Sequence, residues 1–144
     1  MSSVLVDSNV ILDVATNDPL WSAWSAEQLS QYAEEGDLVI NPIIYAEVSI
    51  GFEEHAELEE AVPADTYRRE ALPWEAAFLA GKCFLKYRRL GGGRRAPLPD
   101  FYIGAHASVK DYRLLTRDAR RYRTYFPEVV LICPEPDPDA QSEE

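Results

Sequence analysis

Short apolar runs alternate along the chain with longer segments whose apolar residues recur every three or four positions. Four of the runs have the length of buried strands in a parallel sheet: 4–6, 38–40, 114–116 and 129–132. The longer segments between them have the spacing of amphipathic helices. This alternation predicts an α/β fold with a mostly parallel central sheet.

Residues typical of helix ends support this assignment. Ser8 or Asn9 can cap a helix after the first apolar run, and Asn41, with a proline directly after it, predicts the start of another helix. A loop rich in glycine and arginine is expected at 90–99. Asp100 follows this loop and occupies the position expected of a helix cap.

The composition indicates one domain. A length of 144 residues and a hydrophobic content of 47% are enough for a substantial core. We expect this domain over residues 1–134 and a disordered acidic tail over 135–144. Cys83 and Cys133 are too few for a disulfide framework, which favours a reducing compartment. With no signal peptide and no apolar run long enough to span a membrane, the expected location is cytoplasmic.

The net charge of −11 conceals a strong asymmetry along the chain. Residues 1–67 contain 14 acidic residues and no lysine or arginine. Residues 68–123 contain all 14 basic residues and only 5 acidic ones, and residues 124–144 contain 6 acidic residues and no basic ones. The acidic total therefore does not exclude a nucleic-acid partner, because the basic residues are concentrated in one segment.

Four acidic residues differ from the solvated charge runs: Asp7, Glu47, Asp100 and Asp118. Asp7 and Asp118 follow predicted strands, and ligands of parallel sheets bind at the carboxyl ends of strands. Helix capping is the alternative for each of the three aspartates. Glu47 has apolar neighbours, where a carboxylate without a partner is costly. A cluster of such carboxylates would suit Mg²⁺ or Mn²⁺.

Basic residues flank two of these acids. Arg94 and Arg95 precede Asp100, and Arg117 precedes Asp118, so we expect these arginines to contact the phosphates of an RNA substrate. Four tyrosines of the same segment are candidates for stacking on bases: Tyr87, Tyr102, Tyr122 and Tyr125. The alternative is a solvated face whose arginines pair with the acids of residues 1–67.

No side chain stands out as a catalytic nucleophile. Neither cysteine has a recognisable catalytic context, and His55 lies in an acidic stretch expected to form a surface helix. His106 follows Asp100 by six residues, about 240° around a helix, so the two do not share a face. We therefore expect His106 to be structural. Chemistry at the acidic residues would use an activated water instead.

The segments around the four acids, in this order, resemble the PIN domain, and closely the VapC-type toxin ribonucleases of bacterial toxin–antitoxin systems. The most specific part is PLPDFYIGAHA followed by LLTRDARRYRTYFPEVVLI, and the next is VLVDSNVILD. The Glu47 segment, NPIIYAEVSIGF, is weaker by itself. The resemblance extends from Val4 to about Pro134.

This resemblance implies a three-layer α/β/α fold and a Mg²⁺-dependent endoribonuclease, with Mn²⁺ as a possible substitute. The four acids would form the metal-binding pocket, with Asn9 and Thr116 close to it. The resemblance also implies a homodimer and inhibition by a small antitoxin protein. The competing hypothesis is a PIN-like module that binds RNA or protein without cleaving it.

Overall fold

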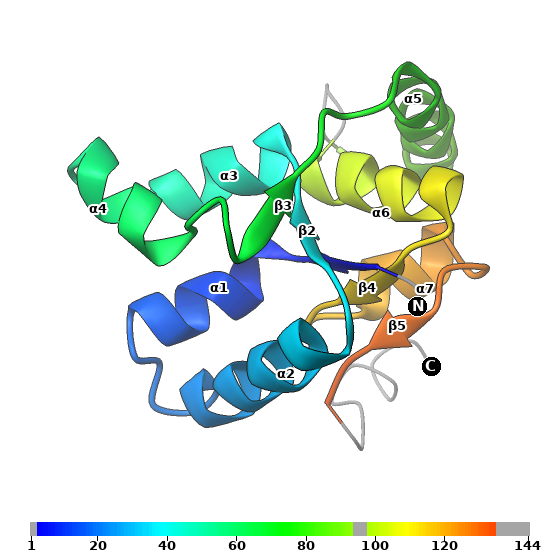
Figure 1. Ribbon diagram of the computed structural model, residues 1–144. Helices are drawn as coiled ribbons and strands as arrows, with labels where there is room; N and C mark the ends of the chain where they lie inside the picture. The colour runs from blue at the N-terminus through cyan, green and yellow to red at the C-terminus, as the bar shows by residue number, and fades with distance from the viewer. Residues whose placement is uncertain (1–2, 94–97, 135–144) are drawn as a thin grey trace.

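The computed structural model describes residues 3–93 and 98–134 (Figure 1). Within them five strands form one sheet with the order β3-β2-β1-β4-β5, and every neighbouring pair is parallel. The strands are β1 (Val4–Val6), β2 (Leu38–Ile40), β3 (Tyr67–Arg69), β4 (Arg113–Leu115) and β5 (Leu131–Ile132). The predicted α/β fold is therefore confirmed, and at least one helix joins each strand to the next strand along the chain.

Helices cover the sheet on both sides. They are α1 (Ser8–Ala15), α2 (Ser22–Glu35), α3 (Pro42–Ser49), α4 (His55–Ala61), α5 (Trp74–Arg89), α6 (Pro99–Lys110) and α7 (Arg120–Tyr125). In Figure 1, α2 lies on one side of the strands and α6 on the other, with α5 packed against α6. In the described part of the chain, no helix is long and apolar enough to cross a membrane.

The register of the sheet brings distant residues together at one edge. β1 is central, between β2 and β4, and Val6 pairs with Leu115. The residues that follow this pair, Asp7 and Thr116, therefore lie side by side at the carboxyl ends of their strands. The chain order reverses direction across the sheet between β1 and β4, and this is the position where open parallel sheets bind ligands.

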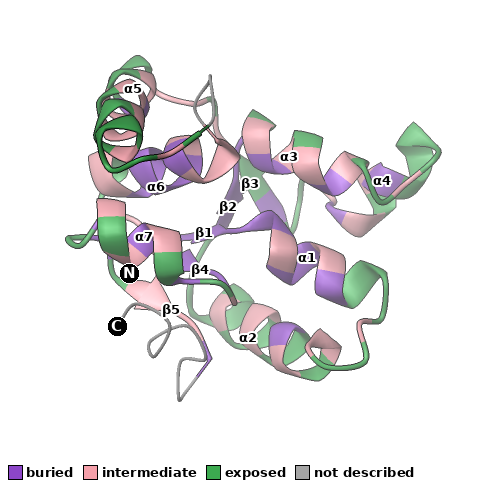
Figure 2. Cartoon of the chain, turned by 180° about the vertical axis from the view of Figure 1, so that it is seen from behind, coloured by how far each residue is buried: buried purple, intermediate pink, exposed green. Residues whose placement is uncertain are grey.

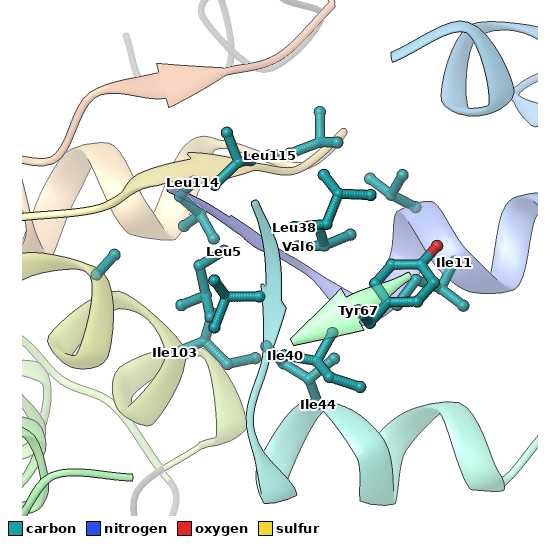
Figure 3. Packing of buried hydrophobic residues seen from close by; sticks show 14 of the residues in the cluster. Leu5, Val6, Ile11, Leu38, Ile40, Ile44, Tyr67, Ile103, Leu114 and Leu115 are labelled. Atoms are coloured by element: carbon teal, nitrogen blue, oxygen red, sulfur yellow. The ribbon is translucent and has the colours of Figure 1, made fainter. Parts of the chain in front are cut away.

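The core that supports this edge is formed by the strands and the helix faces packed on them. Figure 2 shows the buried strands at the centre and the exposed outer surface of α5. Leu5 and Leu114 pair in register, and Leu5 lies next to Ile103 of α6 (Figure 3). All three side chains are fully buried. Burying each such side chain stabilises the fold by about 1.5–3 kcal/mol, which fixes the strands that carry the site.

One strand was not predicted. β3 has the sequence Tyr67-Arg68-Arg69, in which only the tyrosine is buried and both arginines are exposed. It lies at the edge of the sheet, paired only with β2, where one face and one backbone edge meet solvent. An edge strand needs no apolar run, and for this reason the hydrophobic pattern missed it.

The helix ends also differ in detail from the sequence prediction. The residue that caps α1 is Asp7, whose side chain accepts a hydrogen bond from the Ser8 backbone, rather than Ser8 or Asn9. The cap of α6 is Leu98, and Asp100 lies inside the first turn. The proline at the first position of α6 explains the shift, because proline favours the first turn of a helix. Asp100 is thereby released from capping.

Candidate active site

Asp7 is almost completely buried, with only 4% of its surface exposed. Its Oδ1 accepts a hydrogen bond from the Ser8 backbone N–H at 2.7 Å. Its Oδ2 accepts hydrogen bonds from the Thr116 hydroxyl at 2.9 Å and from the Tyr122 hydroxyl at 2.8 Å. All of these donors are neutral, so the carboxylate is held in a fixed orientation without a cationic partner among them.

This environment opposes ionisation of Asp7. Burial, followed by the nearby charge of Asp100, raises the pKa of Asp7 to about 7, although hydrogen bonds from Tyr122 and Thr116 act to lower it. The charge of Glu47 also raises the pKa of Asp7, by a smaller amount. A helix cap alone would not require this arrangement, because capping works equally well at the protein surface. The raised pKa instead marks Asp7 as a candidate functional residue.

Glu47 approaches the same position from α3. Its Oε1 accepts a hydrogen bond from the Ser8 hydroxyl at 2.8 Å, so Ser8 contacts both Glu47 and Asp7. Burial raises the pKa of Glu47, the Ser8 hydrogen bond acts against it, and the charge of Asp100 raises it further. Asp7 caps α1, Glu47 lies in α3 and Asp100 lies in the first turn of α6. The three carboxylates are close enough to interact electrostatically.

Asp100, in the first turn of α6, is linked to Asp7 through one tyrosine. The Tyr122 hydroxyl lies 2.8 Å from Asp7 Oδ2 and 3.4 Å from Asp100 Oδ1. The other oxygen of Asp100 accepts a hydrogen bond from the Arg121 guanidinium at 3.2 Å. Asp100 therefore has an ionic partner, whereas Asp7 is held by neutral donors.

Asp118 belongs to the outer part of this site. Its backbone N–H donates to the Thr116 hydroxyl at 3.1 Å, and the same hydroxyl donates to Asp7. The residue is exposed, and it lines a cavity of about 440 Å³ together with Asp100. The structure thus brings Asp7, Glu47 and Asp100 together and places Asp118 beside them at the cavity.

Asn9 and Thr116 contact each other next to Asp7. The Asn9 side chain donates to the Thr116 hydroxyl at 3.2 Å and accepts from the Arg117 backbone N–H at 3.3 Å. Thr116 in turn contacts Asp7 directly. Asn9, in the first turn of α1, therefore holds the segment that follows β4 at the same edge of the sheet.

The predicted substrate-binding arginines have different outcomes. Arg117 forms an ion pair with Asp13 at 2.7 Å and lies over the ring of Trp21, 5.8 Å from its centroid. This pairing matches the alternative in which arginines bind acids of residues 1–67, and contact of Arg117 with substrate stays a prediction. Arg94 and Arg95 lie outside the described residues.

The acids have the chemistry of a magnesium site, although they do not form a complete set of ligands. Within residues 3–93 and 98–134, no three acidic, histidine or cysteine side chains are close enough together to hold one metal ion. Mg²⁺ is usually bound by one or two carboxylates and completes its shell with waters and substrate oxygens. Asp7 and Asp100 meet that requirement. Their mutual repulsion is the kind of electrostatic cost that a bound cation relieves.

Tyr122 is the site residue that the sequence interpretation missed. It was expected to be available for stacking on bases, and this prediction is wrong because its side chain is 1% exposed. Its hydroxyl instead connects Asp7 and Asp100. A signal was present, since Ala119, Tyr122 and Phe126 are all buried and have helical spacing. That spacing places the tyrosine on the inner face of α7.

His106 lies away from the acids and has a structural role. Asn41 caps α3 by accepting the Ile44 backbone N–H through its Oδ1, so its amide nitrogen must face His106 Nδ1, at 2.9 Å. His106 Nε2 therefore carries the proton and donates to Glu70 at 2.8 Å. Burial lowers the pKa of His106, in keeping with a neutral ring. This network fixes the start of the helix that carries Glu47.

Comparisons with known proteins agree with this geometry. A family model of the PIN domain matches residues 4–127. The fold is similar to VapBC2 from Rickettsia felis bound to a DNA fragment from their promoter, with a TM-score of 0.71 and 14% identity, covering 92% of this chain and 98% of that chain. No curated protein sequence shows significant similarity.

Two further structures have the same fold. VapBC-1 from nontypeable Haemophilus influenzae gives a TM-score of 0.69 and 20% identity, covering 91% of this chain and 97% of that chain. A toxin–antitoxin complex from Klebsiella pneumoniae gives a TM-score of 0.65 and 20% identity, covering 88% of this chain and 95% of that chain. The fold and family predicted from the sequence are thus confirmed. Because the family model spans residues 4–127, the chain belongs to the PIN domain family.

Proposed function

We propose that this chain is a metal-dependent endoribonuclease that hydrolyses RNA phosphodiester bonds and acts as the toxin of a toxin–antitoxin pair. The observation that carries the proposal is the buried Asp7, which shares the Tyr122 hydroxyl with Asp100 and lies in electrostatic range of Glu47. Buried acids at the carboxyl ends of parallel strands are costly for stability, so their presence favours a chemical role. The toxin role is supported by the fold shared with the VapBC complexes.

Mg²⁺ is the cofactor that this donor set suits best, and Mn²⁺ has the same preference for oxygen ligands. Asp7 and Asp100 would hold the ion, with Glu47 and Asp118 at the margin of the site. When bound, the ion would lower the pKa of a water and balance negative charge on the scissile phosphate.

The remaining residues of the site orient these acids. Thr116 and Tyr122 both donate to one oxygen of Asp7, which directs the carboxylate and leaves it no freedom to rotate. The Ser8 hydroxyl holds Glu47 at the same helix start. The Ser8 hydroxyl lies beside these acids, but it is buried and donates its proton to Glu47, so the proposed nucleophile is water.

The test is an RNA cleavage assay with the purified chain, in Mg²⁺ and in EDTA, using structured RNAs and matched DNA. We expect RNA cleavage in Mg²⁺ only, and loss of cleavage in Asp100→Asn. Asp111→Asn is the matched control, because it removes an exposed acid from the other end of the same helix. Asp111 has a φ of 58°, which asparagine also adopts readily.

The experiment also separates the alternative function. RNA binding without cleavage, in Mg²⁺ and in Mn²⁺, would support a non-cleaving binding module and contradict the nuclease. Cleavage that survives in Asp100→Asn would contradict the assignment of the site.

Two partners follow from the proposed toxin role: a small cognate antitoxin and a second copy of this chain. Co-expression with the product of the adjacent small reading frame tests the first, since we expect the pair to purify together and cleavage to be suppressed. Light scattering of the isolated chain tests the second by its mass in solution.

A further inference from the structure

A cavity beside the acids has features that the hydrolysis of a phosphodiester does not itself require. It measures about 440 Å³, within the range of small-ligand sites. Asp100 and Asp118, two of the candidate acids, are among the residues that line it. Its other walls come from α5 and α7, which contribute Tyr87, Arg120, Arg121, Thr124 and Tyr125.

Two tyrosine rings supply aromatic walls. The rings of Tyr87 and Tyr125 have centroids 6.4 Å apart and are inclined by 64°, so they meet edge to face rather than stacking on each other. Both side chains are only half-buried. Their positions are set from behind by the buried Phe101, which packs edge-on against Tyr87 at 5.5 Å and against Tyr125 at 5.2 Å. The cavity thus offers π faces on a rigid support.

Cationic groups accompany these rings. The Arg121 guanidinium lies 5.9 Å from the centroid of Tyr87, and the Lys86 ammonium lies 5.8 Å from that of Tyr125. Both distances are within the range of cation–π contacts. Arg121 also pairs with Asp100 at 3.2 Å, so one guanidinium joins the cavity to the acidic site. The exposed Arg120 adds a second guanidinium to the wall.

We infer that this cavity, between Tyr87, Tyr125 and the arginines 120 and 121, binds one unpaired nucleotide of the RNA strand next to the phosphate that is cleaved. Aromatic rings together with cationic groups fit a ligand that combines a flat base with a phosphate. A paired base keeps its faces covered by its neighbours, so the nucleotide must be single-stranded. The inference rests on RNA as the substrate of the proposed function, and it would make the cavity a determinant of where RNA is cut.

Another cavity of the described residues does not share these features. It measures about 370 Å³ and is lined by residues near the ends of β2 and β3, including Tyr45 and Arg69. None of the four candidate acids lines it. Arg69 is held there by Glu59 at 3.1 Å. A nucleotide in that cavity would have no direct access to the acids, so that cavity does not fit the inference.

The test is binding of fluorescein-labelled single-stranded RNA octamers, measured by fluorescence anisotropy in EDTA so that cleavage does not interfere. We expect Tyr125→Leu to weaken binding by about tenfold, the typical effect of losing one stacked base. Tyr32→Leu is the matched control, since Tyr32 also has an arginine over its ring, Arg113 at 5.2 Å, but lies on α2. Thermal unfolding confirms that each variant is folded, and Tyr125→Phe, which keeps the ring, should bind like the original chain.

A scan of abasic octamers makes the test specific for a base in the cavity. We expect one abasic position to weaken binding to the original chain about tenfold and to have no effect on Tyr125→Leu. If Tyr125→Leu binds like the original chain, or keeps the same sensitivity to that position, the inference is wrong. Because these measurements need no catalysis, RNA binding that depends on Tyr125 without any cleavage would contradict the proposed nuclease and leave the subsite standing.

Discussion

Replacing Asp7 by asparagine should stabilise the protein while removing its activity. Asp7 is buried, and it is held by neutral donors close to the charges of Asp100 and Glu47. Its pKa is raised to about 7, whereas an aspartate in the unfolded chain titrates near 3.9. Between these values the folded state binds a proton that the unfolded state has released, so stability falls as the pH rises.

The size of this effect follows from the two pKa values. A separation of about three pKa units corresponds to about 4 kcal/mol lost at a pH above 7, with about 1.5 kcal/mol of it already lost at pH 5. Asparagine has no such titration, but it perturbs the hydrogen bonds from Thr116 and Tyr122, each worth about 1 kcal/mol. We therefore expect Asp7→Asn to be more stable than the original chain by about 1–3 kcal/mol at pH 8.

The assay is urea denaturation of both chains at pH 5 and pH 8 in EDTA. The stability gap is the free energy of unfolding of Asp7→Asn minus that of the original chain. It should increase by about 2–3 kcal/mol from pH 5 to pH 8. His106 has a lowered pKa, so its contribution is lost as the pH falls below about 6.5, which is the opposite direction. That contribution is present in both chains and cancels in the difference. Added Mg²⁺ should stabilise the original chain and not Asp7→Asn.

Asp13→Asn is the matched control for this prediction. Asp13 is also a buried aspartate of α1, but it is paired with Arg117 at 2.7 Å and accepts a hydrogen bond from Ser25 at 3.0 Å. Its replacement should destabilise the fold by about 2 kcal/mol because a charge-assisted hydrogen bond is lost. A stability gap for Asp7→Asn that is negative at pH 8, or that does not change with pH, would refute the reasoning.

Three further variants test the surroundings of the site. Tyr122→Phe removes a donor that lowers the pKa of Asp7, so the rise of Mg²⁺-dependent cleavage with pH should shift to higher pH; an unchanged pH profile would contradict this role. Gly104→Ala places a Cβ 2.3 Å from the buried ring of Phe126 and should lower the free energy of unfolding by about 1–3 kcal/mol in urea denaturation. His106→Phe removes the hydrogen bonds to Glu70 at 2.8 Å and to the buried Asn41 at 2.9 Å, so thermal unfolding should show a loss of about 2 kcal/mol, with cleavage at 25 °C largely retained.

The central part of the fold could be predicted because it depends on local patterns. The strands β1 and β2 are fully apolar runs, and β4 contains two buried leucines. Their order along the chain, separated by helices, is enough to predict a parallel sheet. Asp7 could then be placed at a strand end, because it directly follows an apolar run. The edge strand β3 has no such run, so only pairing with β2 in three dimensions identifies it.

The environment of the acids could not be predicted, because it depends on contacts between distant residues. Tyr122 reaches Asp7 across 115 positions of sequence, and Arg117 reaches Asp13 across 104. The sequence places Asp7 directly before the predicted helix and Asp13 within it. It does not indicate which of them an arginine neutralises. The packing of the segment after β4 against α1 determines that Arg117 pairs with Asp13.

The contrast between these two aspartates separates structural from chemical roles. Asp7 caps α1 and Asp13 lies within it, and both are buried, where an unpaired charge is costly. At Asp13 the Arg117 guanidinium offsets this cost by forming an internal ion pair with the carboxylate. Asp7 instead receives hydrogen bonds from hydroxyl and backbone donors. The nearby charges of Asp100 and Glu47 increase the free-energy cost of ionising it. Arg121, directly before Tyr122 in the sequence, pairs with Asp100 instead. Stability alone gives no reason for such an arrangement. The proposed divalent cation does, because a cation held by Asp7 and Asp100 would offset the repulsion between their carboxylates.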